Sequence, residues 1–231
     1  MQAFDSLSRD IQQYIYDKGW PSLTSIQNAA IKQVANTDHN LILSAPTASG
    51  KTEAAFIPAL NSVEDWETGL KVLYISPLKA LINDQFQRIS ELSEYLDIPI
   101  TRWHGEVSQA QKRKVVNQPK GVLLITPESI EGMLVNRPGE AQHLFKGVEW
   151  IIIDELHSFL GTERGIHLQS LLQRISQFMQ EPRFIAMSAT LNKKDFGYAK
   201  AFFGSQRDTD ILVDRDKNDL LITIDYTSGE A

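Results

Sequence analysis

The sequence predicts an α/β protein built on a doubly wound, mostly parallel sheet. Short runs of β-branched and aliphatic residues recur along the chain, and a polar segment with helical spacing follows each of them. Such runs are typical of strands that are buried on both faces of a parallel sheet. We expect these strands at Leu41–Ala45, Val72–Ser76, Val122–Thr126, Trp150–Asp154 and Phe184–Ser188.

The segments between the strands have the apolar spacing of helices that pack on a sheet. Steps of three and four residues separate Ile82, Phe86, Ile89, Leu92 and Leu96, and likewise Leu168, Leu171, Leu172, Ile175 and Phe178. Strand–helix alternation of this kind gives right-handed βαβ units, in which ligands bind at the carboxyl ends of the strands. Polar segments directly follow the apolar runs, as this rule requires: Ala45-Pro46-Thr47, Ser76-Pro77-Leu78, Thr126-Pro127-Glu128, Asp154-Glu155 and Ser188-Ala189-Thr190.

Composition limits the classes of protein and of site. The 231 residues include 42% hydrophobic and 23% charged residues, the balance of an ordinary globular protein. The formal charge of −6 would repel a phosphate backbone, so any nucleic-acid site must be a local patch. The absence of cysteine excludes disulfides and cysteine-ligated metals. No apolar run approaches the roughly 20 residues of a membrane span, so we expect a soluble, cytoplasmic protein.

A phosphate-binding loop is the strongest motif. Residues Ala45 to Thr52 have the form A-x-x-x-x-G-K-T between a strand and a helix, which is a Walker A pattern. The backbone N–H groups of Thr47, Ala48, Ser49 and Gly50 would surround the phosphates of ATP. Lys51 would contact the β- and γ-phosphates and Thr52 would ligate Mg²⁺. The alternative is a fortuitous turn before a helix.

Two acids follow the buried strand Trp150–Asp154. Asp154 is suited to hold Mg²⁺ through its water shell, and Glu155 to deprotonate the water that attacks the γ-phosphate. Taken alone, Asp154 could instead cap the next helix. The phosphate loop favours the catalytic assignment, with Lys51, Asp154 and Glu155 as the catalytic residues.

Together these segments resemble the first motor domain of DExH-box superfamily 2 helicases, a RecA-like P-loop NTPase domain. The resemblance covers nearly the whole chain and includes Asp154-Glu155-Leu156-His157. Ser76-Pro77-Leu78-Lys79-Ala80-Leu81 and Arg164-Gly165-Ile166-His167-Leu168 are most similar to the large helicase-related (Lhr) group. One departure is Ala48, where the family usually has glycine; we expect only a modest change in loop flexibility.

The resemblance implies roles that spacing alone does not indicate. Gln27 is similar to the glutamine that binds the adenine edge, although a surface glutamine at the start of a helix is the simpler alternative. His157, Ser188 and Thr190 resemble residues that couple the γ-phosphate site to domain motion. For His157, a structural role is the alternative.

The resemblance also implies that this protein contacts the sugar–phosphate backbone of single-stranded DNA or RNA. The contacting residues follow three of the β-strands. These residues are Ser76, Pro77, Leu78, Lys79, His104, Gly105, Thr126, Pro127, Glu128 and Ser129. Ser-Pro and Thr-Pro are also ordinary helix starts, which is the alternative for either segment. Lys112-Arg113-Lys114 is interpreted as a solvated helix face.

The predicted organisation is one RecA-like ATP-binding domain, residues 1–213. Residues 214–231 would hold a last strand, Leu220 to Tyr226, and the start of a connection to a second RecA-like domain. Nothing in the chain resembles the arginine-finger motif of such a second domain. We therefore expect an ATP-dependent helicase or translocase whose isolated domain binds ATP and nucleic acid weakly, with little turnover. The alternatives are a catalytically idle nucleotide-binding scaffold and a P-loop transferase or kinase.

Overall fold

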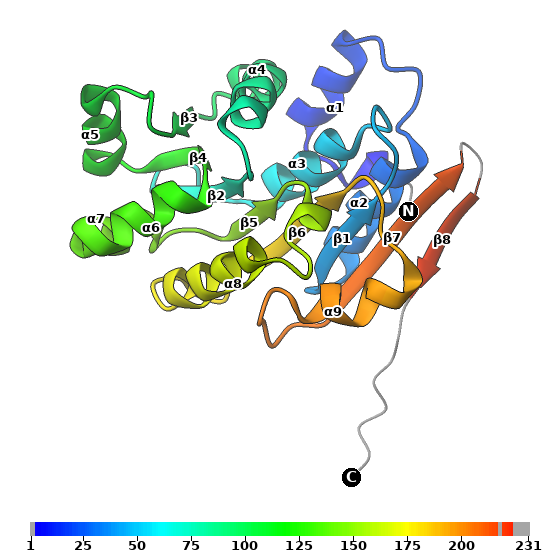
Figure 1. Cartoon of the computed structure of the whole chain (residues 1–231). Coiled ribbons are helices and arrows are strands. Elements are labelled where there is room, and N and C mark those ends of the chain that lie inside the picture. The colour runs from blue at the N-terminus through cyan, green and yellow to red at the C-terminus, as the bar shows by residue number, and fades with distance from the viewer. Residues whose placement is uncertain (1–2, 217–218, 224–231) are drawn as a thin grey trace.

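A single sheet with helices on both faces forms the protein (Figure 1). The computed structural model describes residues 3–216 and 219–223. In the described part, the strand order is β3-β4-β2-β5-β6-β1-β7-β8. All neighbouring strands are parallel except β7 and β8, which pair antiparallel. The strands are β1 Asn40–Ser44, β2 Gly69–Ile75, β3 Ile100–Trp103, β4 Lys120–Ile125, β5 Trp150–Ile153, β6 Arg183–Ser188, β7 Thr209–Asp216 and β8 Asp219–Thr223.

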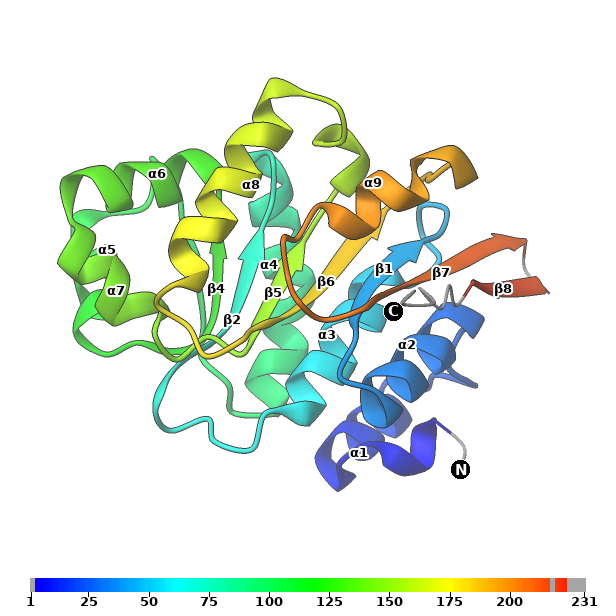
Figure 2. The ribbon, with the colours of Figure 1, turned by 90° about the horizontal axis from the view of Figure 1, so that it is seen from below.

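The helices divide into two layers, one on each face of the sheet (Figure 2). The first layer contains α1 Arg9–Asp17, α2 Ser25–Asn36, α3 Lys51–Ser62 and α4 Lys79–Tyr95. The second contains α5 Gln109–Asn117, α6 Pro127–Asn136, α7 Pro138–Phe145, α8 Glu163–Ser176 and α9 Phe196–Ala201. Short 3-10 turns occur at η1 Phe4–Ser6, η2 Leu156–Ser158 and η3 Lys193–Asp195.

Alternation along the strands produces two apolar cores. In β1, Leu41 and Leu43 pack with the first layer, while Ile42 packs with the second. Because side chains alternate between the faces of a strand, a strand covered on both faces must be apolar throughout. This confirms the doubly wound, mostly parallel sheet that the continuous apolar runs predict.

The C-terminal part of the sheet differs from the prediction. β7 was not predicted, because its apolar stretch is only Ile211, Leu212 and Val213, with Asp210 and Asp214 on either side. It nevertheless pairs with β1 over five positions. The sheet therefore continues past residue 213. The predicted strand Leu220 to Tyr226 corresponds to β8, and residues 224–231 lie outside the described part.

Local signals fix where the helices at the site begin. Thr126 caps α6, with Pro127 in its first turn, and Thr162 caps α8 by accepting from the Gly165 N–H group at 3.1 Å. Within the described residues, no helix has the length and apolar character needed to cross a bilayer.

Candidate nucleotide and nucleic-acid site

The phosphate loop connects the carboxyl end of β1 to the first turn of α3. Gly50 has φ of 83°, and a Cβ atom there would lie 2.5 Å from Nε2 of Gln27. Glycine is therefore required at this position both for its backbone conformation and for space. No side chain caps α3, so its first N–H groups point toward the loop, the arrangement that favours an anion.

Ala48 adopts the left-handed conformation, with φ of 62°. This conformation costs about 1–2 kcal/mol in a residue that has a Cβ atom. Alanine therefore strains the loop at this position, and glycine would not. The expected modest change in loop flexibility stays a prediction.

Lys51 points back into the loop. Its ammonium donates to the carbonyl oxygens of Ala45 and of Pro46, the latter at 2.7 Å. Burial lowers the pKa of Lys51, while the negative charges of Glu155 and Asp154 act in the opposite direction. Lys51 follows β1 and the two acids follow β5, and both strands are parallel neighbours of β6, so all three residues lie at the carboxyl end of the sheet.

Asp154 is buried at the carboxyl end of β5 and is held by two donors. The Tyr74 hydroxyl donates to Oδ2, and the backbone N–H of Glu155 donates to Oδ1 at 2.9 Å. Desolvation raises the pKa of Asp154, and the Tyr74 hydrogen bond partly offsets this rise. Burial, and then the charge of Asp154, raise the pKa of Tyr74 well above its ordinary value.

Glu155 begins the segment that leads away from the sheet. Its φ of 50° places it in the left-handed region, and its carboxylate lies 3.3 Å from Nδ1 of His157. The same His157 nitrogen is 3.3 Å from Oγ of Ser188, which donates to the carbonyl oxygen of Thr190 at 2.8 Å. Glu155, His157, Ser188 and the Thr190 backbone therefore form one connected set.

Thr52 and Gln27 lie on the first-layer side of the loop. Thr52 is buried, and its hydroxyl donates to Oε1 of Gln85 on α4 at 3.1 Å. Gln27 completes a capping box with Thr24, and its Nε2 donates to the Gly50 carbonyl oxygen at 3.4 Å. Gln27 thus both opens α2 and contacts the phosphate loop. It is buried, so the alternative of a surface glutamine is wrong, and its contact with adenine stays a prediction.

The oxygen ligands at this site fit Mg²⁺. Thr52 supplies a hydroxyl and Asp154 a buried carboxylate, and Mg²⁺ prefers such hard oxygen donors while keeping several waters. The raised pKa of Asp154 reflects a carboxylate for which burial is unfavourable, so a nearby cation would favour its charged form. Among the described residues, no group of three or more His, Cys, Asp or Glu forms a separate metal site.

The predicted nucleic-acid residues divide by exposure. Ser76, Pro77, Thr126, Pro127 and His104 are buried. These segments follow β2, β3 and β4 and together form an edge of the sheet that we call the rim. The five buried side chains lie beneath the outer surface of the rim. Burial also lowers the pKa of His104.

The exposed members of this set are Leu78, Lys79, Gly105 and Glu128, with Ser129 partly exposed. Lys79 pairs with Glu106. Within the predicted set, these are the residues that are open to solvent.

Arg164 was not predicted as a site residue, yet it joins two of the rim segments. Its Nη2 donates to the Pro77 carbonyl oxygen at 2.8 Å and to Oε1 of Glu128 at 2.7 Å. Burial raises the pKa of Glu128, but hydrogen bonds from its own N–H and from Arg164 outweigh burial and leave it lowered. Glu128 thus holds Arg164, and Arg164 neutralises the acid at the rim.

The comparisons with known proteins agree with this geometry. Residues 24–196 match the DEAD/DEAH box helicase family. The chain belongs to this family. It is 29% identical over 229 residues to the ATP-dependent helicase Lhr-Core of Methanocaldococcus jannaschii, covering 91% of this chain and 26% of that protein. It is 32% identical over 214 residues to the Lhr helicase/uracil glycosylase of Escherichia coli, covering 82% of this chain and 13% of that protein.

The structural comparison leads to the same group. The structure of Mycobacterium smegmatis helicase Lhr bound to ssDNA and AMP-PNP matches with a TM-score of 0.81 at 28% identity, covering 93% of this chain and 28% of that chain. The chain is thus the N-terminal RecA-like domain of an Lhr-group helicase. It spans between 13% and 28% of the length of these relatives.

Proposed function

We propose that this chain binds ATP with Mg²⁺ and forms the first half of a motor that moves along, or remodels, a single strand of DNA or RNA. The observation that carries the proposal is that Lys51, after β1, and the pair Asp154-Glu155, after β5, both lie at the carboxyl end of the parallel sheet. The Lhr structure bound to ssDNA and AMP-PNP supports the choice of ligands.

Under this proposal, each residue at the nucleotide site has one chemical task. The ammonium of Lys51 would leave the carbonyl oxygens of Ala45 and Pro46 to contact the phosphates. Thr52 and Asp154 would hold Mg²⁺, which supplies charge neutralisation during phosphoryl transfer. Glu155 would accept a proton from the attacking water, and His157 orients its carboxylate through the 3.3 Å contact.

We also propose that efficient turnover needs a second RecA-like domain. An arginine finger contributes about 10³–10⁵ in rate in related nucleotide hydrolases. The isolated chain should therefore bind nucleotide but hydrolyse it slowly, and its affinity for nucleic acid should be weak.

Single-turnover hydrolysis with Glu155→Gln tests this function. The variant should bind Mg–ATP within about threefold of wild type and hydrolyse it about 10²–10⁴-fold more slowly, the usual contribution of a general base. Glu163→Gln is the matched control, because Glu163 is an exposed acid in the same segment of chain, and its hydrolysis rate should not change. Equal rates for wild type and Glu155→Gln would favour the idle scaffold instead.

A further inference from the structure

A groove between α5 and α6 continues from the rim toward the edge of the sheet. Its volume is about 350 Å³, and its lining includes Trp103, Gly105, Lys112, Ser129, Gly132 and Arg137. Gly105 and Ser129 are also members of the exposed rim set. The groove is therefore continuous with the surface that the proposed function assigns to nucleic acid.

The strand order gives this surface a direction. The loops after β2, β4 and β3 lie side by side in that order, and β3 is the edge strand. Neighbouring strands are about 4.8 Å apart, so these loops span about 10 Å. The groove lies between the segments that follow β4 and β3, so a strand that crosses the rim toward β3 passes its opening.

The charge of the groove is opposite to that of the whole molecule. Lys112 and Arg137 line it, and no acid does, although the chain has a net charge of −6. Lys112 also lies 5.7 Å from the centre of the Trp103 ring, and Arg137 pairs with Glu140 at a loose 3.4 Å. Both cations remain partly exposed. Phosphate is the ligand that such a pair attracts.

Gly132 supplies an independent observation. It lies in the interior of α6, where glycine costs about 1 kcal/mol relative to alanine. Its φ is not positive, and an added Cβ would meet nothing within 4 Å. Neither conformation nor packing therefore requires glycine. Its effect is to leave the groove open.

We propose that this groove binds one further nucleotide of the single strand, with its phosphate between Lys112 and Arg137 and its base above Gly132. The inference rests on the proposed function and extends its binding track beyond the rim loops. Lys112, which the sequence suggested was part of a solvated helix face, would bind this phosphate.

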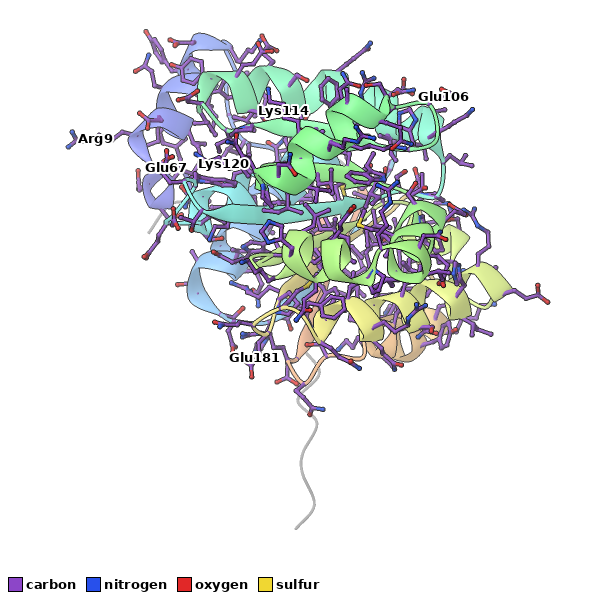
Figure 3. All side chains as sticks on the ribbon, turned by 90° about the vertical axis from the view of Figure 1, so that its left-hand side faces the viewer. Arg9, Glu67, Glu106, Lys114, Lys120 and Glu181 are labelled. Carbon is purple, nitrogen blue, oxygen red and sulfur yellow. The ribbon has the colours of Figure 1, made fainter. Side chains whose placement is uncertain are left out.

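Fluorescence anisotropy with labelled oligodeoxythymidylate of 12 nucleotides, in Mg²⁺ and AMP-PNP, tests the groove on the full 231-residue chain. The test variant combines Lys112→Gln with Arg137→Gln. The control combines Lys114→Gln with Lys120→Gln, which removes the same charge from a separate cavity. Lys120 lies beside Glu67, away from Glu106 and the rim (Figure 3).

The test variant should lose about fivefold in affinity at 0.1 M salt, and its salt slope should fall by about 0.7, the expectation for one phosphate of a single strand that is no longer neutralised. The control should lose less than about twofold. Equal losses in the two variants would overturn the groove while leaving the proposed function intact. A wild-type chain that binds no strand at all would overturn both.

A second pair of variants tests the groove without changing charge. Gly132→Leu fills the groove, and Gly197→Leu places the same side chain on α9, where an added Cβ also meets nothing within 4 Å. Gly132→Leu should weaken strand binding at least fivefold while its circular dichroism and AMP-PNP affinity match wild type. Unchanged strand affinity in a folded Gly132→Leu protein would refute the groove.

Discussion

Replacing Tyr74 by phenylalanine removes one buried oxygen atom and one hydrogen bond to Asp154. Tyr74 is fully buried in β2, and the carboxylate that it contacts is itself buried. Hydrogen bonds to charged groups contribute about 1.5–3 kcal/mol, and the acceptor left behind would also be poorly solvated. We therefore expect Tyr74→Phe to lower the free energy of unfolding by about 1.5–3 kcal/mol. The lost orientation of Asp154 should raise the Mg²⁺ concentration for half-maximal ATP hydrolysis about tenfold.

Tyr95→Phe is the matched control for this experiment. The Tyr95 hydroxyl also donates to a carboxylate, that of Asp17 at 2.7 Å, but both groups are exposed. Its loss should cost less than about 0.5 kcal/mol, as for ordinary surface substitutions. Urea unfolding followed by circular dichroism, and a Mg²⁺ titration of ATP hydrolysis, measure the two quantities. Equal unfolding free energies for the two variants would refute the argument that the buried hydroxyl supports Asp154.

Three other substitutions test separate features. Ala48→Gly should raise the free energy of unfolding by about 0.5–1 kcal/mol, because relief of the left-handed strain exceeds the entropy of the added glycine; a lower urea midpoint would contradict this. Arg164→Ala should weaken single-strand binding up to about fivefold, because it leaves the charge of Glu128 uncompensated. Adding Glu128→Gln should restore part of this affinity when both variants are titrated with the strand. Additive losses in the double variant would contradict this. Burial lowers the pKa of His104, so the unfolded chain binds the proton more readily and the free energy of unfolding should fall as pH drops below about 6.5. In urea melts, His104→Gln should lose less of this free energy than wild type between pH 7.5 and 5.5. Identical losses would exclude the contribution of His104.

Sequence patterns predicted the elements that are covered on both faces. Strands β1, β2, β4, β5 and β6 are continuous apolar runs, because buried parallel strands have no solvent-facing side. β7 has a short apolar stretch between acids, which carries a much weaker signal. The phosphate loop and the acid pair were also predictable, because each is contiguous in sequence and requires particular residue types.

The supporting residues could not be predicted in the same way. Tyr74, Gln85 and Arg164 act through partners that are 80, 33 and 36 or more positions away in the chain. Their roles depend on which strands are neighbours and on side-chain direction, which periodicity does not specify. A tyrosine within an aliphatic run was the one available signal, since a buried hydroxyl needs a polar partner.

The segment from Asp154 to Arg164 connects the acid pair to the rim. It leaves the acids through the fully buried Leu156 and Phe159, which anchor it to the second core. Gly165 approaches so closely that an added Cβ would lie 1.9 Å from the Phe159 carbonyl oxygen, so α8 is fixed against this turn.

Arg164, at the start of the same helix, then binds the rim segments that follow β2 and β4. Because Leu156 and Phe159 hold this connection against the core, a displacement of either rim segment would be transmitted toward Glu155. A flexible loop would instead change its own conformation. In this fold the short path between the proposed nucleic-acid rim and Glu155, the proposed general base, lies within one stretch of chain, and Arg164 is the contact that links its far end to the rim.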